Sequence, residues 1–143
     1  MDHRYRVQLI NSLSGVKSAN LIGSISQNNQ TNLAIFSSVV HLGSNPAIVG
    51  FIMRPDTVER HTLDNIQHTK QYTINQVNHN FWQAAHQTSA RYLKTQCEFE
   101  QTGLSPEFIE GIHAPFVAQS TLKYSLSLQD IIPINVNNTL LVI

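Results

Sequence analysis

The stretch from Thr31 to Pro55 carries the side chains in this sequence that are best suited to hold a ligand. Two strand-like apolar runs flank the corner Gly43-Ser44-Asn45-Pro46, and hydroxyls, amides and Arg54 stand among side chains that favour burial. Because alternate residues of a strand share a face, each face of such a pair combines apolar bulk with a hydroxyl. This pattern predicts a site for a flat aromatic ligand, whose polar edge or phosphate would contact Ser37, Ser38 and nearby backbone N–H groups. A single hydroxyl of this kind usually bonds to neighbouring backbone, so the prediction depends on the cluster.

A possible phosphate pocket follows directly. Thr62 is a suitable N-cap for a short helix over Leu63–Thr69, with Asp64 in its first turn. The free N–H groups at a helix start attract anions, and Arg54, Arg60 and His61 stand just upstream. A capped surface helix with solvated charges explains the same residues equally well.

Other chemistries find little support in the spacing of residues. The chain has no G-x-G-x-x-G, no G-x-x-x-x-G-K-[ST] and no G-x-S-x-G pattern. Their absence argues against a Rossmann dinucleotide-binding fingerprint, a P-loop and the nucleophile elbow of a hydrolase. The seven histidines lack the short spacing of zinc ligands, so we expect no metal site. Cys97, the one cysteine, stands between Gln96 and Glu98 without a neighbour that would favour a thiolate, and is expected to be structural.

The composition fits a single domain of 143 residues, over residues 1–143. Nine basic and nine acidic residues give a net charge of zero and a pI near 7.1, so neither nucleic acid nor an anionic membrane surface is an expected partner. The N-terminal MDHRYRVQLINS lacks the apolar centre of a signal peptide, and no apolar run is long enough to span a membrane. Together with the single cysteine, this favours a cytoplasmic protein.

The remaining pattern is rich in strands. Residues 1–16 read as a lead-in with Tyr5, Val7 and Leu9 alternating in a short edge strand, and residues 18–31 and 32–42 as a hairpin around a polar turn. Further strands are predicted over 47–53, buried on both faces, and over 72–77, 123–128 and 139–143.

A second helix is predicted from Phe81 to about Arg91, with Phe81, Trp82 and Ala85 facing the core. Residues 92–114 are expected to form a long irregular wrapping loop or lid. The count of strands predicts a mainly β domain, a β-barrel or sandwich with short helices. Because the last apolar run has no turn or cap after it, we expect the domain to be C-terminally incomplete.

Several segments, taken in order, resemble the flavin reductase-like proteins of the FMN-binding split-barrel fold, including the flavoredoxin-type branch. The segments are TNLAIFSSVVHLGSNPAIVGF, RHTLDNI, YTINQV, AHQTSARY, CEFEQTGLSPEF and APFVAQS. The resemblance implies a split β-barrel that forms a homodimer, binds FMN at or near the subunit interface and passes hydride from NAD(P)H to flavin. A protein or a second flavin would be the electron acceptor.

The resemblance also implies cofactor-binding positions along these segments. They are Thr31, Asn32, Ala34, Phe36, Ser37 and Ser38 on the first strand, Phe51, Met53 and Arg54 at the end of the next, Arg60, His61 and Thr62 at the helix start, and His86, Thr88 and Ser89 further on. Hydride transfer between stacked rings requires no dedicated acid or base, so no catalytic side chain is nominated. The alternative is an FMN-carrying electron-transfer or binding protein without NAD(P)H turnover.

Overall fold

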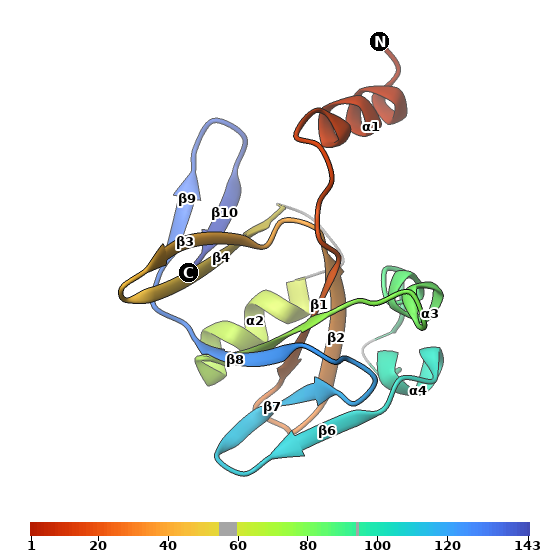
Figure 1. Cartoon of the computed structure of the whole chain (residues 1–143), viewed down its shortest axis with the longest axis vertical. Coiled ribbons are helices and arrows are strands. Elements are labelled where there is room, and N and C mark those ends of the chain that lie inside the picture. Colours follow the sequence, from red (N-terminus) through yellow and green to blue (C-terminus); the bar gives the residue numbers. More distant parts are fainter. Residues whose placement is uncertain (55–59, 94) are drawn as a thin grey trace.

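The protein consists of two antiparallel four-stranded sheets, a small covering hairpin and short helices (Figure 1). The computed structural model describes residues 1–54, 60–93 and 95–143. The helices are α1 (His3–Leu13), α2 (Arg60–Thr69), α3 (Trp82–Gln87) and α4 (Glu98–Thr102). The strands are β1 (Asn20–Ile25), β2 (Thr31–Phe36), β3 (Val40–Ser44), β4 (Ala47–Met53), β5 (Gln71–Gln76), β6 (Pro106–Ile109), β7 (Ile112–Val117), β8 (Lys123–Ser127), β9 (Ile131–Ile134) and β10 (Thr139–Val142).

The first sheet has the strand order β2-β1-β5-β8, and the second has the order β3-β4-β10-β9. The predicted hairpin is confirmed, since β1 pairs with β2 in a register that places Ser24 opposite Asn32. The predicted strand at residues 32–42 is divided, because β2 ends at Phe36 and β3 begins at Val40 in the other sheet. No strand pairing joins the two sheets in the described residues, so the barrel is split.

The interior between the sheets is apolar. Its buried side chains come from both sheets and from α2: Ile22, Ala34, Phe36, Phe51, Met53, Ile66, Tyr72, Ile74 and Val142. A second apolar cluster lies on the opposite face of the first sheet under α3 and α4, and includes Leu21, Leu33, Phe81, Ala85, Phe99 and Val117. Ala34 and Leu33 therefore face opposite sides, as the alternation in β2 predicts.

The hairpin β6–β7 covers the first sheet at close range. Thr73 Oγ1 donates to the Pro115 carbonyl over 2.6 Å, and Asn75 accepts from Val117 N while its amide donates to Leu21 O. Gly23 permits this approach, because a Cβ there would lie 2.1 Å from the Pro115 carbonyl oxygen. The covering hairpin is thus fixed to the sheet by buried hydrogen bonds.

Four local predictions were wrong. The expected N-terminal strand is the helix α1, which Asp2 caps by accepting a hydrogen bond from Tyr5 N. The helix predicted over Leu63–Thr69 is α2, Arg60–Thr69, so Thr62 lies inside it instead of capping it, and Asp64 is beyond the first turn. Trp82, predicted to face the core, is 54% exposed, whereas Ala85 on the same helix, α3, is buried.

The fourth error concerns residues 92–114, predicted to be an irregular lid. They contain α4, β6 and the start of β7. Gly103, at φ +73°, ends α4, and Gly111, at φ +82°, forms the tight turn between β6 and β7. The glycines that suggested irregularity therefore connect short regular elements. Burial of β4 is also less complete than predicted, since Ala47 is exposed.

Candidate functional site

The outer edge of β2 is the feature around which the predicted residues gather. The register with β1, and the bond from Ser26 N to Gln30 O, direct the backbone groups of Asn32 and Ala34 toward β1. The backbone groups of Thr31, Leu33 and Ile35 point away from β1. Leu33 N donates to Glu98 Oε2 over 3.4 Å, so α4 covers the middle of this edge. One pocket lies at each end.

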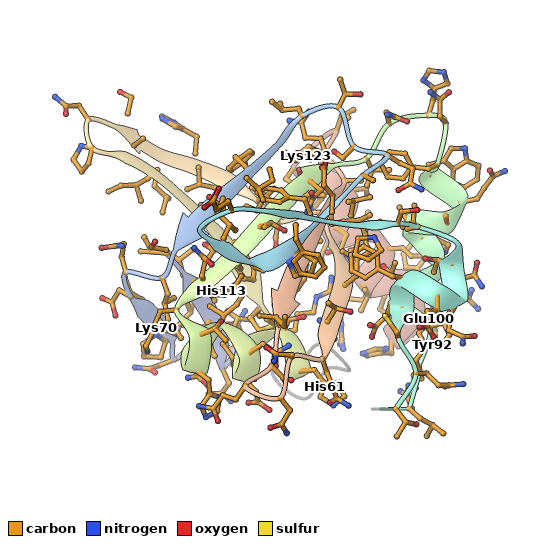
Figure 2. The ribbon with its side chains drawn as sticks, turned by 90° about the horizontal axis from the view of Figure 1, so that it is seen from below. His61, Lys70, Tyr92, Glu100, His113 and Lys123 are labelled. Atoms are coloured by element: carbon orange, nitrogen blue, oxygen red, sulfur yellow. The ribbon has the colours of Figure 1, made fainter. Side chains whose placement is uncertain are left out.

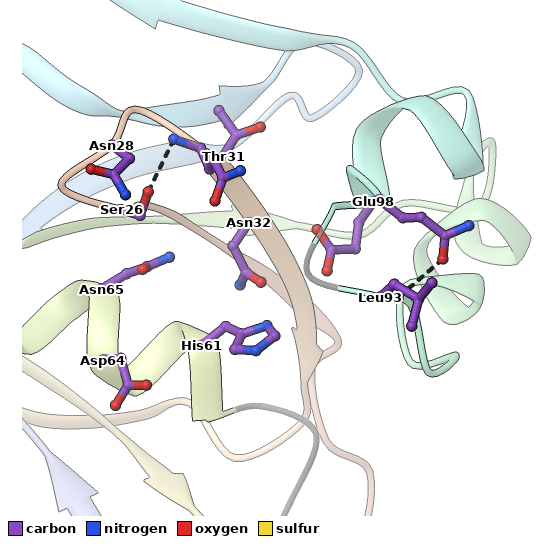
Figure 3. A pocket seen from close by; sticks show the side chains of 11 residues that line it. Ser26, Asn28, Thr31, Asn32, His61, Asp64, Asn65, Leu93 and Glu98 are labelled. Atoms are coloured by element: carbon purple, nitrogen blue, oxygen red, sulfur yellow. Dashed lines mark hydrogen bonds between the residues drawn. The ribbon is translucent and has the colours of Figure 1, made fainter.

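The first, the Thr31 pocket, has a volume of about 200 Å³ and opens between β2, α2 and α4 (Figure 3). Asn32, His61 and Glu98 project into it from these three elements. Its remaining lining is mostly polar: Ser26, Asn28, Gln30, Thr31, Asp64, Asn65, Leu93 and Gln96. In the view from below, His61 lies at the start of α2, and Tyr92 and Glu100 lie on the side of α4 (Figure 2).

Among the described residues, the charged groups that line the Thr31 pocket do not favour a phosphate. Two carboxyl groups, of Asp64 and Glu98, line it together with the imidazole of His61. Burial raises the pKa of the Glu98 carboxyl, while the hydrogen bond from Leu33 N opposes part of that rise. The pocket is better suited to neutral hydroxyl and amide groups than to an anion.

The second, the Ser37 pocket, has a volume of about 310 Å³ and the opposite charge character. Lys17 and Arg54 line it, with no carboxylate among its described lining residues. The rest of its lining comes from α1, from β2 and the segment after it, and from β4: Asn11, Ile35, Phe36, Ser37, Ser38 and Ile52. Two cations beside two serines form a set that can bind a phosphate.

The hydroxyl of Ser38 forms hydrogen bonds within the protein. It donates to Ile52 O and accepts from Ile52 N, both over 3.1 Å, and so joins the end of β2 to β4 of the other sheet. At the other end, the pair Asn32–Thr62 joins β2 to the helix α2, because Asn32 Nδ2 donates to Thr62 Oγ1 over 2.9 Å. Both residues of this pair are buried.

The remaining predicted residues lie outside these two pockets. The side chains of Ala34, Phe51 and Met53 are buried in the interior between the sheets. Arg60 is the first residue of α2, and its side chain lies outside the described part of the chain. On and after α3, Thr88 Oγ1 donates to Ala85 O and Ser89 Oγ to His86 O, so these hydroxyls close the helix end.

No local pattern in the sequence identifies Lys17, Asn11 or Glu98 as site residues. Asn11 was assigned to a lead-in strand, and the helix α1 brings it beside Ser37. Glu98 contacts β2 only because α4 packs against that strand. Glu98 and Leu33 are 65 positions apart in the chain. Long-range proximity of this kind leaves no local pattern. The hydroxyl of Thr31 lies 3.3 Å from Cys97 Sγ.

Two kinds of feature, a metal-ligand cluster and a membrane-spanning helix, are absent from the described residues, 1–54, 60–93 and 95–143. They contain no group of three or more His, Cys, Asp or Glu side chains placed to hold a metal ion. None of their helices is long and apolar enough to cross a membrane.

Comparison with solved structures identifies the same fold elsewhere. A split-barrel protein from Shewanella frigidimarina NCIMB 400, provisionally described as a flavin reductase, superposes with a TM-score of 0.95 at 51% identity. The match covers 99% of this chain and 70% of that one. The flavoredoxin of Desulfovibrio vulgaris (Miyazaki F) superposes with a TM-score of 0.76 at 18% identity, covering 92% of this chain and 71% of its own. At that identity the likeness shows the fold alone.

A curated relative is an uncharacterised protein of Aquifex aeolicus (strain VF5), 24% identical over 115 residues. That alignment covers 79% of this chain but 59% of the relative, so the chain spans little more than half of its length. The family model described as "Flavin reductase like domain" matches residues 16–143, from the segment after α1 to the last residue. The chain therefore belongs to the flavin reductase-like family, and its fold is the split barrel of that family.

Proposed function

We propose that this protein is an FMN-binding oxidoreductase of the flavin reductase type, which passes hydride from NAD(P)H to flavin. The observation that carries the proposal is the outer edge of β2, with a polar pocket at one end and a cationic pocket at the other. From Asn32 to Phe36 a strand extends about 13 Å at roughly 3.3 Å per residue. An elongated ligand with one neutral and one anionic end fits such a surface.

The charges of the two pockets predict which end of the ligand lies in which pocket. Lys17 and Arg54 suit the phosphate of FMN, and Ser37 can add a hydroxyl contact. The carboxylates at the Thr31 pocket would repel the phosphate there and can accept hydrogen bonds from hydroxyl or imide groups. This orientation differs from the sequence-based hypothesis of a phosphate at the start of α2.

The residues present fit a flavin in chemistry as well as in charge. A flavin needs donors for its pyrimidine edge, and the outward N–H groups of Thr31 and Ile35 are available by the register of β2. Asn32 and Thr62 hold the strand and helix at a fixed separation through their hydrogen bond. When bound, the flavin itself would supply the redox chemistry, while these groups position it.

We propose further that the protein acts as a cytoplasmic homodimer. The helix α1 has no buried residue, and apart from Asn11 at the Ser37 pocket it projects from the rest of the fold (Figure 1). Tyr5, Ile10 and Leu13 are each more than half exposed on it. An isolated helix of this length is marginal in water, so a covering surface on a second copy would stabilise it.

Two measurements test the proposed function. Titration of the purified protein with FMN should give a stoichiometric complex with a perturbed visible spectrum. Steady-state oxidation of NADH and NADPH in the presence of FMN should then show turnover. A protein that binds FMN but oxidises neither nucleotide would be the carrier alternative, and a protein that binds no flavin would contradict both proposals.

A further inference from the structure

One wall of the Ser37 pocket comes from α1 and from the connection that follows it. Asn11, in the last turn of α1, and Lys17, between α1 and β1, both line the pocket. The family model begins at residue 16, so α1 lies outside the part of the chain that it matches. The contribution of α1 to the pocket is therefore an addition to what the family model describes.

No hydrogen bond joins α1 to the sheets in the described part of the chain. Its bonds are internal, such as those from Tyr5 N to Asp2 at the start and from Gly15 N to Ser12 O at the end. None of its residues is buried. Without burial or long-range hydrogen bonds, a helix of eleven residues is marginal in water.

The charges of α1 also oppose its own dipole. Arg4 and Arg6 lie in the first turn, where the helix N-terminus carries a partial positive charge, and no basic residue lies in the last turn. Residues 1–17 carry Arg4, Arg6 and Lys17 against one carboxylate, that of Asp2. A bound anion would therefore offset the excess positive charge of this segment.

Asn11 is the residue of α1 that is placed to contact such an anion. Its side chain is exposed and has no hydrogen-bond partner among the described residues. Asn lowers helix stability by up to about 0.7 kcal/mol relative to Ala, because its amide competes for backbone groups. The carbonyl end of α1 weakens the attraction for an anion, and the ammonium group of Lys17 offsets this effect. The Asn11 amide can donate two hydrogen bonds to a ligand in the pocket.

The face of α1 that carries Asn11 differs from the face that carries its exposed apolar side chains. At about 100° per residue, Tyr5, Ile10 and Leu13 lie a quarter-turn or more around the helix from Asn11. One side of the helix can therefore contact a ligand in the pocket while another side is covered by a second copy of the chain.

We propose that Asn11 contacts the phosphate of bound FMN, and that this contact orders α1 as a strap over the Ser37 pocket. The inference rests on the proposed function, because it takes FMN as the ligand. Arg54 and Lys17 balance the charge of the phosphate, and the Asn11 amide donates to a phosphate oxygen. Order in α1 and affinity for FMN are then linked, since a ligand that contacts the ordered strap favours the ordered state.

Two matched substitutions on α1 test this contact. Asn11→Asp replaces the amide with a carboxylate of nearly the same size at the pocket, and Gln8→Glu makes the same change one turn away, at an exposed position that is not among the described lining residues. Titrations with FMN and with riboflavin, which lacks the phosphate, are compared at roughly 0.15 M salt, where screening limits the effect of remote charges. Amide exchange of residues 8–12, followed by NMR at one protein concentration, reports order in α1, with Ile22 in β1 as the reference for global opening.

Saturating FMN should slow exchange in α1 of the wild type at least about fivefold, and saturating riboflavin less than about twofold. Asn11→Asp should weaken FMN binding at least about fivefold and riboflavin binding less than about twofold, while Gln8→Glu changes neither by more than about twofold. FMN binding that leaves exchange in α1 unchanged, or equal effects of the two substitutions on FMN affinity, would overturn the inference while the proposed function stands. A wild-type protein that binds no FMN would overturn both.

Discussion

Asn32 donates from its side-chain amide to the hydroxyl of Thr62 across 2.9 Å, and this bond ties the edge strand β2 to the first turns of α2. Both side chains are buried, and among the described residues each is a hydrogen-bond partner of the other. The two were nominated as cofactor contacts on the basis of resemblance. Their mutual bond shows that they also hold the two walls of the Thr31 pocket together.

Replacing Thr62 with Val should destabilise the protein by about 1–3 kcal/mol, because the buried Asn32 amide loses its acceptor while the side-chain volume hardly changes. Chemical denaturation measures this free energy. Thr121→Val, at an exposed position, is the matched control and should change stability by less than about 0.5 kcal/mol. Equal effects of both substitutions would show that the buried bond contributes nothing.

Gly23→Ala should be among the most damaging single substitutions. The added methyl would lie 2.1 Å from the Pro115 carbonyl oxygen and 2.6 Å from Thr73 Oγ1, so β7 would have to move off the sheet. We expect a loss of at least about 3 kcal/mol. Gly43→Ala is the control, since its nearest neighbour would be 3.5 Å away, in ordinary contact. A wild-type melting curve for Gly23→Ala would refute the close packing described here.

Glu98→Gln should stabilise the protein at neutral pH. Burial raises the pKa of this carboxyl above 4.5, so the folded state binds its proton more tightly than the unfolded state does. The wild type therefore loses stability as pH rises from about 4.5 through the raised pKa, and the Gln variant does not. The difference between their melting temperatures should be small at pH 4 and grow toward pH 7. A constant difference would exclude ionisation of Glu98 as its cause.

Tyr72→Phe should leave stability unchanged or raise it by about 1 kcal/mol, because the fully buried hydroxyl has no hydrogen-bond partner among the described residues. Its ring packs edge-on against Phe51 with centroids 5.7 Å apart, a contact that Phe preserves. Burial, with a smaller contribution from nearby Tyr124, raises the pKa of Tyr72 to about 12. A loss of more than about 1 kcal/mol on substitution would reveal a partner for the hydroxyl.

Local sequence patterns predicted the hairpin of β1 and β2 because a polar turn separates two runs with opposite faces. They failed at α1, where Tyr5, Val7 and Leu9 alternate like a strand while Asp2 supplies a helix cap. The Thr31 pocket was only partly foreseeable. Asn32 and His61 lie in motifs, whereas Glu98 arrives through packing of α4 against β2. Lys17 lacked any local signal, since its significance comes from its place beside Ser37 and Arg54.

Paired titrations with FMN and riboflavin test the proposal that an FMN phosphate binds in the Ser37 pocket. Riboflavin lacks the phosphate, so Lys17→Gln should weaken FMN binding about tenfold and riboflavin binding less than twofold. Lys70→Gln, at an exposed position outside both pockets, should change neither affinity. Equal weakening of the binding of both flavins by Lys17→Gln, or unchanged FMN binding, would show that the phosphate does not bind beside Lys17.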